Sequence, residues 1–228
     1  MIQNKKIRIV LIHAMPFSID PIAQAFTKLW PEAQTVNLLD DSLSRDLLEA
    51  THLTEKIAER IVTLAEYGLG IGAHGILFTC SAFGDAIKQA KEKLSIPVLK
   101  PNEAMFEEAL KTGANIGMLA TFGPSVPSME SEFIALSKQT NPKAQITSIL
   151  EQEALAALQA GNKEEHNRLL KKAAAAFKGY DAVMLAQFSA SQAFTSVSEA
   201  VDCPVLTSPH SAVAKLKREV AATGNNTS

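Results

Sequence analysis

The chain repeats one pattern of apolar and polar residues, and this repetition limits the folds that it can adopt. At an offset of 107 residues, segment 75–99 resembles segment 182–206, since both hold an apolar run, a helical stretch and a second apolar run opening at a proline. At an offset of 108, residues 10–13 resemble residues 118–121. Self-similarity at such a distance indicates duplicated structural units. We therefore expect two related halves.

The order of the apolar runs predicts the class of each half. Short runs rich in Val, Ile and Leu alternate with longer helical stretches, which is typical of parallel, mostly buried strands covered by helices on both faces. We expect strands at 7–12, 34–38, 75–80, 97–99, 115–120, 145–150, 181–186 and 204–206. We expect helices near 20–30, 53–67, 85–94, 103–112, 126–138, 151–175, 190–201 and 211–221, the sixth broken at Gly161-Asn162. The fold class is α/β, with two pseudo-symmetric halves and parallel sheets.

Cys80 is the strongest candidate for chemistry. It closes the apolar run 75–80 and is followed by small residues and then by the helical stretch 85–94. The thiol is therefore expected at the carboxyl end of a buried strand, where open α/β sheets bind ligands. The partial positive charge of a helix N-terminus there would favour thiolate over thiol. The alternative is an inert buried cysteine. At the offset of 107, the partner of Cys80 is Gln187.

Charge and cysteine count exclude several classes of protein. A net charge of -2 and a pI near 6.2 argue against a nucleic-acid partner. The polar start, residues 1–6, leads directly into a strand, so we expect neither a signal peptide nor a membrane span. Cys80 and Cys203 lie too far apart for a metal spacing or a disulfide framework, and no glycine-rich nucleotide loop follows the first strand. We expect a cytoplasmic protein without metal or cofactor.

Several segments together carry a resemblance to a known family. They are Ile76-Leu77-Phe78-Thr79-Cys80-Ser81, Ile96-Pro97-Val98-Leu99, Gly117-Met118-Leu119-Ala120-Thr121, and Asp181-Ala182-Val183-Met184-Leu185 followed by Cys203-Pro204-Val205-Leu206. With the duplication, these segments resemble the aspartate/glutamate/hydantoin racemase superfamily over most of the chain. The resemblance implies two Rossmann-like halves, residues 1–105 with 211–228 and residues 106–210, and an active site in the cleft between them.

The resemblance also implies a mechanism without cofactor. Racemases of this superfamily use one cysteine from each half, on opposite faces of a small amino-acid or hydantoin-like substrate that bears a carboxylate. Cys80 matches the first cysteine, whereas Gln187 stands at the position of the second. An amide neither holds nor releases a proton at neutral pH. Ordinary two-base racemisation therefore needs another group here.

Three interpretations of this departure remain open. The protein could be an isomerase in which Ser189, Glu103 or His210 serves the second face of the substrate. It could resemble the single-cysteine decarboxylases of the arylmalonate type, in which one thiol protonates a carbanion. It could also be a catalytically inactive protein that binds small carboxylates.

Other polar residues are candidates for substrate binding. Thr121 and Ser125 follow the fifth predicted strand and open a helix, where hydroxyls and backbone N–H groups could hold a carboxylate. His13 belongs to the matching first loop, and His210 falls opposite Glu103 at the offset of 107. Cys203 precedes a proline in a predicted strand and is expected in the core. The remaining candidate binding residues flank these positions: Thr79, Ser81, Phe122, Phe188 and Ser189. Assembly into a homo-oligomer is left open.

Overall fold

The computed structural model describes residues 6–225 and divides the chain into two compact units. The first unit contains the chain up to Pro101 together with the residues from Ala212 onward, and the second unit contains Asn102–Ser211. Within the described residues, each unit contains one four-stranded parallel sheet. The predicted α/β class with two parallel sheets is therefore confirmed.

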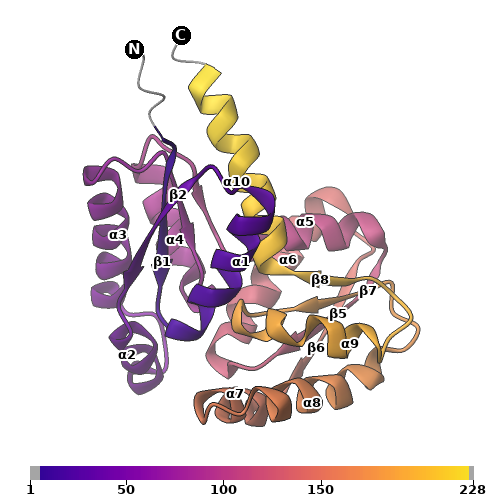
Figure 1. Ribbon diagram of the computed structural model, residues 1–228. Helices are drawn as coiled ribbons and strands as arrows, with labels where there is room; N and C mark the ends of the chain where they lie inside the picture. The colour runs from indigo at the N-terminus through magenta and orange to yellow at the C-terminus, as the bar shows by residue number, and fades with distance from the viewer. Residues whose placement is uncertain (1–5, 226–228) are drawn as a thin grey trace. The chain divides into compact units, whose positions relative to one another are not determined.

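The first sheet is formed by β1 (Arg8–His13), β2 (Gln34–Leu39), β3 (Gly75–Phe78) and β4 (Val98–Leu99), in the order β2-β1-β3-β4. Its helices are α1 (Ile19–Leu29), α2 (Ser42–Ala50), α3 (Glu55–Gly70), α4 (Gly84–Lys93) and most of α10 (Ser208–Asn225) (Figure 1). The central strands β1 and β3 are almost entirely buried. Their continuous apolar runs, rather than an alternating pattern, agree with a sheet that is covered on both faces.

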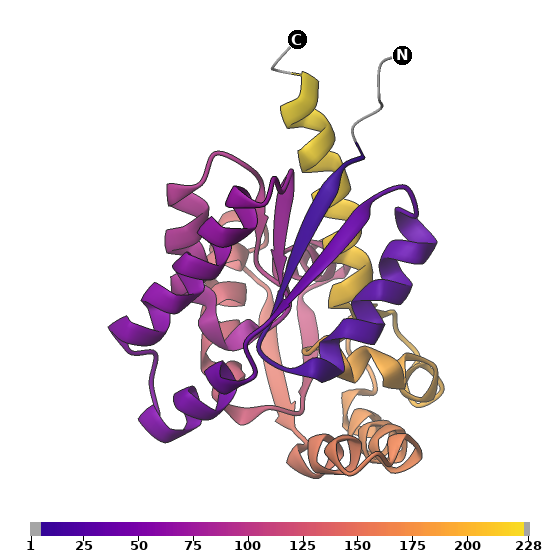
Figure 2. The same ribbon diagram turned by 60° about the vertical axis from the view of Figure 1, so that its left-hand side comes forward.

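Helices cover both faces of this sheet. A Cβ atom at Gly75 would lie 2.9 Å from Val220 of α10, whereas one at Gly68 of α3 would lie 3.2 Å from Val10 of β1. Figure 2 shows α3 and α4 on one side of the strands and α1 with α10 on the other. The close approach at Gly75 leaves no room for a side chain there.

The second unit repeats this plan. Its sheet is formed by β5 (Asn115–Ala120), β6 (Gln145–Leu150), β7 (Ala182–Leu185) and β8 (Val205–Thr207), in the order β6-β5-β7-β8. Its helices are α5 (Glu103–Thr112), α6 (Val126–Thr140), α7 (Gln152–Gln159), α8 (Lys163–Ala174) and α9 (Phe194–Ser198). One apolar cluster packs α5 and α6 against one face of the sheet. A second cluster packs α8 and α9 against the strand residues that point to the other face.

The strand registers show how the halves correspond. Ile9 pairs with Gly75 in the first sheet, and Ile116 pairs with Ala182 in the second. Both members of the second pair follow those of the first by 107 residues, so one offset covers β1 as well as β3. The sequence offset of 108 for the first strand is therefore wrong by one residue. His13 corresponds to Ala120 rather than to Thr121.

The helices differ from expectation in two places, and one predicted break is confirmed. Helix α2 was not predicted at all. The predicted break at Gly161-Asn162 is confirmed: α7 ends before it, α8 begins after it, and Gly161 has a positive φ of 78°. The segment predicted as a helix over 190–201 is mostly the 3-10 helix η5 (Ser189–Ala193) followed by the short α9.

Candidate active site

Cys80 lies two residues beyond β3, at the carboxyl edge of the first sheet. It precedes the 3-10 helix η2 (Ser81–Phe83), which leads into α4. The sulfur takes a hydrogen bond from the backbone N–H of Ala82 and contacts the hydroxyl of Ser44. Part of the Cys80 surface remains accessible. The thiol is therefore held by polar groups at the edge where parallel sheets bind ligands.

The ionisation of Cys80 differs from expectation. Desolvation raises the pKa of the thiol to about 11, and the contacts with Ala82 and Ser44 offset only part of this effect. The prediction that Cys80 is favoured as a thiolate is therefore wrong for the protein without bound substrate. The helix effect is weak because only the three-residue η2 follows Cys80 directly, while α4 begins at Gly84. Burial of the sulfur outweighs it.

His13 is the last residue of β1 and not a loop residue, which corrects the sequence interpretation. Its side chain is fully buried, and its two ring nitrogens lie 2.9 Å from Asn37 Oδ1 and 2.8 Å from Thr79 Oγ1. Asn37 Oδ1 only accepts, so Nε2 carries the hydrogen and Nδ1 accepts from the Thr79 hydroxyl. Burial lowers the pKa of His13, which keeps the ring neutral. The ring joins Asn37 of β2 to Thr79, which lies between the end of β3 and Cys80.

Gln187 stands two residues beyond β7, at the position that corresponds to Cys80. Its Oε1 accepts from the backbone N–H of Thr121 at 2.8 Å and from the Thr121 hydroxyl at 3.3 Å. Its Nε2 donates to Ser125 Oγ at 2.8 Å, and the Ser125 hydroxyl donates to the Phe122 carbonyl at 2.8 Å. The structure thus brings Gln187, Thr121 and Ser125 together in one network.

The other predicted binding residues fall into two groups. Ser81, Phe122, Phe188 and Ser189 are buried, with exposed fractions between 1% and 7%. His210 is exposed on α10, and its Nδ1 lies 3.2 Å from Thr207 Oγ1. Glu103 is the first residue of α5, where its carboxylate interacts favourably with the helix N-terminus.

Cys203 lies at the amino end of β8, whereas Gln187 follows the carboxyl end of β7. It precedes β8 and packs against the apolar cluster of α8 and α9, although the residue stays partly exposed. Desolvation raises the pKa of its thiol. Nothing in these surroundings activates the sulfur.

Sequence reasoning missed Ser44 and Asn37. Ser44 lies on the unpredicted α2, donates to the Ala14 carbonyl at 3.0 Å and contacts the sulfur of Cys80. The signal for α2 was present: Asp40, Asp41 and Ser42 precede buried Leu43 and Leu47, a polar start followed by apolar residues four apart. The role of Asn37 depends on cross-strand pairing, which no local pattern encodes.

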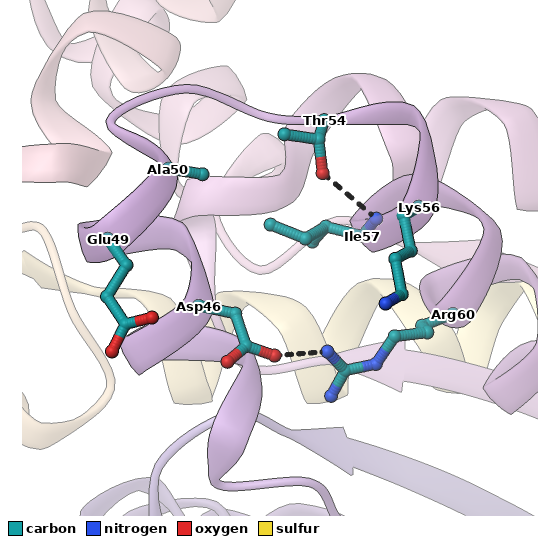
Figure 3. Close-up of a pocket in the computed structure, with 7 residues that line it drawn as sticks. All are labelled: Asp46, Glu49, Ala50, Thr54, Lys56, Ile57 and Arg60. Atoms are coloured by element: carbon teal, nitrogen blue, oxygen red, sulfur yellow. Dashed lines mark hydrogen bonds and ion pairs between the residues drawn. The ribbon is translucent and has the colours of Figure 1, made fainter.

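A surface hollow of about 440 Å³ lies between α2 and α3 (Figure 3). Arg60 of α3 and Asp46 of α2 form an ion pair across it, and the Thr54 hydroxyl accepts from the Ile57 N–H at 3.3 Å. Cys80 does not line it. The lining residues are Asp46, Glu49, Ala50, Thr54, Lys56, Ile57 and Arg60.

Two classes of feature are absent from the residues that the structure describes. Over residues 6–225, no cluster of three or more His, Cys, Asp or Glu side chains is arranged to hold a metal ion. In the same range no helix combines the length and apolar character needed to span a bilayer. The cytoplasmic location and the oligomeric state stay predictions.

The sequence matches the model of one known protein family. The family model described as Asp/Glu/Hydantoin racemase matches residues 19–179, well over half of the sequence. The chain belongs to this racemase family. Racemases are isomerases, so the protein is a racemase-like isomerase. No curated protein is similar enough in sequence to match it.

Solved structures support the same fold. Glutamate racemase isoform RacE1 from Bacillus anthracis matches with a TM-score of 0.74 and 14% identity, covering 96% of this chain and 84% of that one. Allantoin racemase from Klebsiella pneumoniae gives a TM-score of 0.69 at 16% identity, with coverage of 95% and 89%. Aspartate racemase from Picrophilus torridus gives 0.67 at 15% identity, with coverage of 94% of each chain. The TM-scores establish the fold, whereas sequence identities this low do not identify the substrate.

Proposed function

We propose that this protein is a cofactor-independent enzyme that moves a proton at the carbon alpha to the carboxylate of a small substrate. Cys80 is the proton carrier. The single observation that supports this role is its place: a thiol beyond a central parallel strand, held by Ala82 and Ser44, in a member of a racemase family. Substrates of the amino-acid or hydantoin type fit the family, and one structural neighbour was solved with D-glutamate.

The resting state of the thiol sets the order of events. With a pKa of about 11, Cys80 is protonated at neutral pH and must lose its proton before it can act as a base. A bound substrate that brings positive charge, such as an ammonium group, would lower this pKa. Proton removal by the thiolate then gives an enolate-like carbanion, and return of a proton completes exchange.

Gln187 gives the reaction its asymmetry in this proposal. The amide cannot act as the second acid, but one of its N–H hydrogens has no partner in the network with Thr121 and Ser125. That hydrogen is suited to a carboxylate or to the developing enolate. The Thr121 and Ser125 hydroxyls support the amide and orient it. The prediction that both halves serve one site stays open.

One observation favours a second candidate, a decarboxylase of the arylmalonate type. A thiol that is protonated at rest is ready to deliver a proton to a carbanion left by loss of carbon dioxide. This reaction needs no thiolate in the free enzyme and no second proton carrier. Both features agree with Gln187 at the second position.

Incubation of the purified protein in deuterated water tests both candidates. Aspartate, glutamate, allantoin and a 2-arylmalonate are the first substrates, followed by NMR and chiral chromatography. Racemisation scrambles the stereocentre and exchanges its hydrogen, whereas decarboxylation releases carbon dioxide and leaves one deuterium. Cys80→Ala should abolish either activity, and Cys203→Ala should keep it. An enzyme that needs Cys203 but not Cys80 would disprove the proposal.

A further inference from the structure

Helix α2 places a hydroxyl group against the Cys80 thiol. Ser44 is 5% exposed, its hydroxyl donates to the Ala14 carbonyl at 3.0 Å, and it also contacts the sulfur. Ala14 follows directly after His13, so Ser44 joins α2 to the end of β1 as well as to the thiol. A buried serine that reaches two such groups has a fixed orientation.

Two kinds of contact hold α2 in place. Leu43 and Leu47 are buried in the core, with exposed fractions of 0% and 5%. On the opposite side, Arg60 of α3 binds Asp40 at 2.5 Å and also pairs with Asp46 (Figure 3). Arg60 is about a third exposed, so its ion pairs add little free energy. Their effect is geometric, since they fix both ends of the segment that carries Ser44.

The hydroxyl of Ser44 has a single hydrogen to share between two acceptors. While Cys80 is a thiol, this hydrogen binds the Ala14 carbonyl, and the Ser44 oxygen is free to accept from the S–H group. When Cys80 becomes a thiolate, the hydrogen can turn to the sulfur, and the Ala14 carbonyl then loses its partner. The turn stabilises the thiolate, and the lost bond limits the gain.

We propose that Ser44 is a positioning residue for Cys80, which aims the thiol and donates to the thiolate while the proton is away. The role rests on the proposed function, in which Cys80 carries the proton. Ser44 itself exchanges no proton with the substrate. The sequence of events balances: the proton leaves the sulfur for the substrate or solvent, and the Ser44 hydrogen changes its acceptor without leaving its oxygen.

The test measures the ionisation of Cys80 directly. In a Cys203→Ala background Cys80 is the one cysteine of the sequence, so alkylation by iodoacetamide from pH 7 to 11 reports its thiolate fraction. Ser44→Ala should move the profile to higher pH and lower the thiolate fraction at a given pH, by less than the roughly tenfold effect of an uncompensated charged hydrogen bond, because the thiolate gains the Ser44 hydrogen at the expense of the Ala14 carbonyl. Ser44→Thr keeps the hydroxyl and should restore the profile.

Ser137→Ala is the matched control. Ser137 is also 5% exposed and also donates to a backbone carbonyl, that of Ile134, at 3.0 Å, but it lies on α6. Its variant should leave the Cys80 profile unchanged. A Ser44→Ala protein with native circular dichroism and an unshifted profile would overturn the proposal.

A second measurement needs no change at Ser44. The S–H stretching band of Cys80 in the Cys203→Ala protein should lie at the low frequency of a hydrogen-bonded thiol. A band at the frequency of a free thiol would overturn the inference even if Ser44→Ala failed to fold.

Solvent exchange of a substrate separates this inference from the proposed function. Exchange that depends on Cys80 while Ser44→Ala leaves both exchange and alkylation unchanged would overturn the role of Ser44 alone. A shifted alkylation profile in a protein without any exchange activity would support the contact and overturn the proposed function.

Discussion

The side-chain oxygen of Gln187 accepts a hydrogen bond from the backbone N–H of Thr121 at 2.8 Å. Since a backbone N–H can only donate, this contact fixes which end of the amide faces β5. The nitrogen must then face Ser125, as its distance of 2.8 Å to Ser125 Oγ confirms. Gln187 therefore joins the loop after β7 to the loop after β5 within the second unit.

Gln187→Cys should add racemisation, because it supplies a second group that can hold and release a proton at the position equivalent to Cys80. Gln187→Ala is the control, since it loses the same hydrogen bonds without gaining a thiol. The measurement is the stereochemical course of deuterium incorporation into one substrate. We expect delivery to one face in the wild type and to both faces only in the cysteine variant. Delivery to both faces in the wild type would instead point to another residue, with His210 the first to test.

The same two variants should lose stability to a similar degree. Each gives up the bonds of the amide to Thr121 and Ser125, and each bond contributes on the order of 1 kcal/mol. The measurement is the free energy of unfolding in urea. A Gln187→Ala protein as stable as the wild type would show that the network does not brace these loops.

The thiol of Cys80 should react slowly near neutral pH. Its pKa is raised from 9.0 to about 11, so the thiolate fraction at pH 8 falls about a hundredfold below that of an unperturbed thiol. Alkylation in the Cys203→Ala background, compared with N-acetylcysteine, measures this difference. A bound substrate that lowers the pKa of Cys80 should speed its alkylation. A bound substrate that covers the sulfur should block it. A thiol that titrates near 7 without ligand would contradict the structure.

The strands were predictable because their signal is local and duplicated. The apolar runs of β3 and β7 match at an offset of 107, and this match alone placed Gln187 at the position of Cys80. The ladders confirm the correspondence, since Leu77 pairs with Leu99 and Met184 with Leu206. The offset of 108 for the first strand failed because similarity of short apolar runs does not fix register to one residue.

The environment of the candidate site was not predictable in the same way. His13 looked like a loop residue, but its ring is buried between Asn37 and Thr79, which are far from it in sequence. The pKa of Cys80 depends on desolvation, which outweighs the helix effect visible in the sequence. Ser44 was missed with its helix, because a nine-residue amphipathic segment between two polar turns carries a weak signal.

The stability of the protein should fall in mild acid, with His166 as one cause. His166 is fully buried on α8, its Nδ1–H donates to the Ala154 carbonyl at 2.8 Å, and Nε2 has no partner among the described residues. Burial lowers its pKa, and Lys163 adds to the effect. The unfolded chain binds the proton first, so the stability present above pH 6.5 is lost as the pH falls through the lower folded pKa.

Urea unfolding between pH 5 and 8 checks this pH dependence. His166→Gln should flatten the profile without removing it, because burial also lowers the pKa of His13. His52→Gln changes an exposed histidine and serves as the control. Equal profiles for the wild type and His166→Gln would assign the acid loss to other groups.

Gly117→Ala should destabilise the second unit, because β5 passes directly under an aromatic ring. A Cβ atom at Gly117 would lie 2.6 Å from the ring of Phe177, which is 1% exposed. The ring cannot retreat easily, since it also packs edge-on against Tyr180 at 5.1 Å. Overpacking of this kind costs about 1–3 kcal/mol of the free energy of unfolding.

A double-mutant cycle identifies the cause of that loss. Phe177→Leu removes the ring and costs stability by itself, but it should relieve the clash, so the double variant should be more stable than the sum of the single changes predicts. Gly70→Ala is the control, because a Cβ at Gly70 meets nothing within 4 Å, and alanine there should be neutral or stabilise by up to about 1 kcal/mol. Urea unfolding of the four proteins gives the coupling energy. Strictly additive losses would show that the glycine is required for a reason other than the ring, and a Gly117→Ala protein as stable as Gly70→Ala would show that β5 can shift away from Phe177 at little cost.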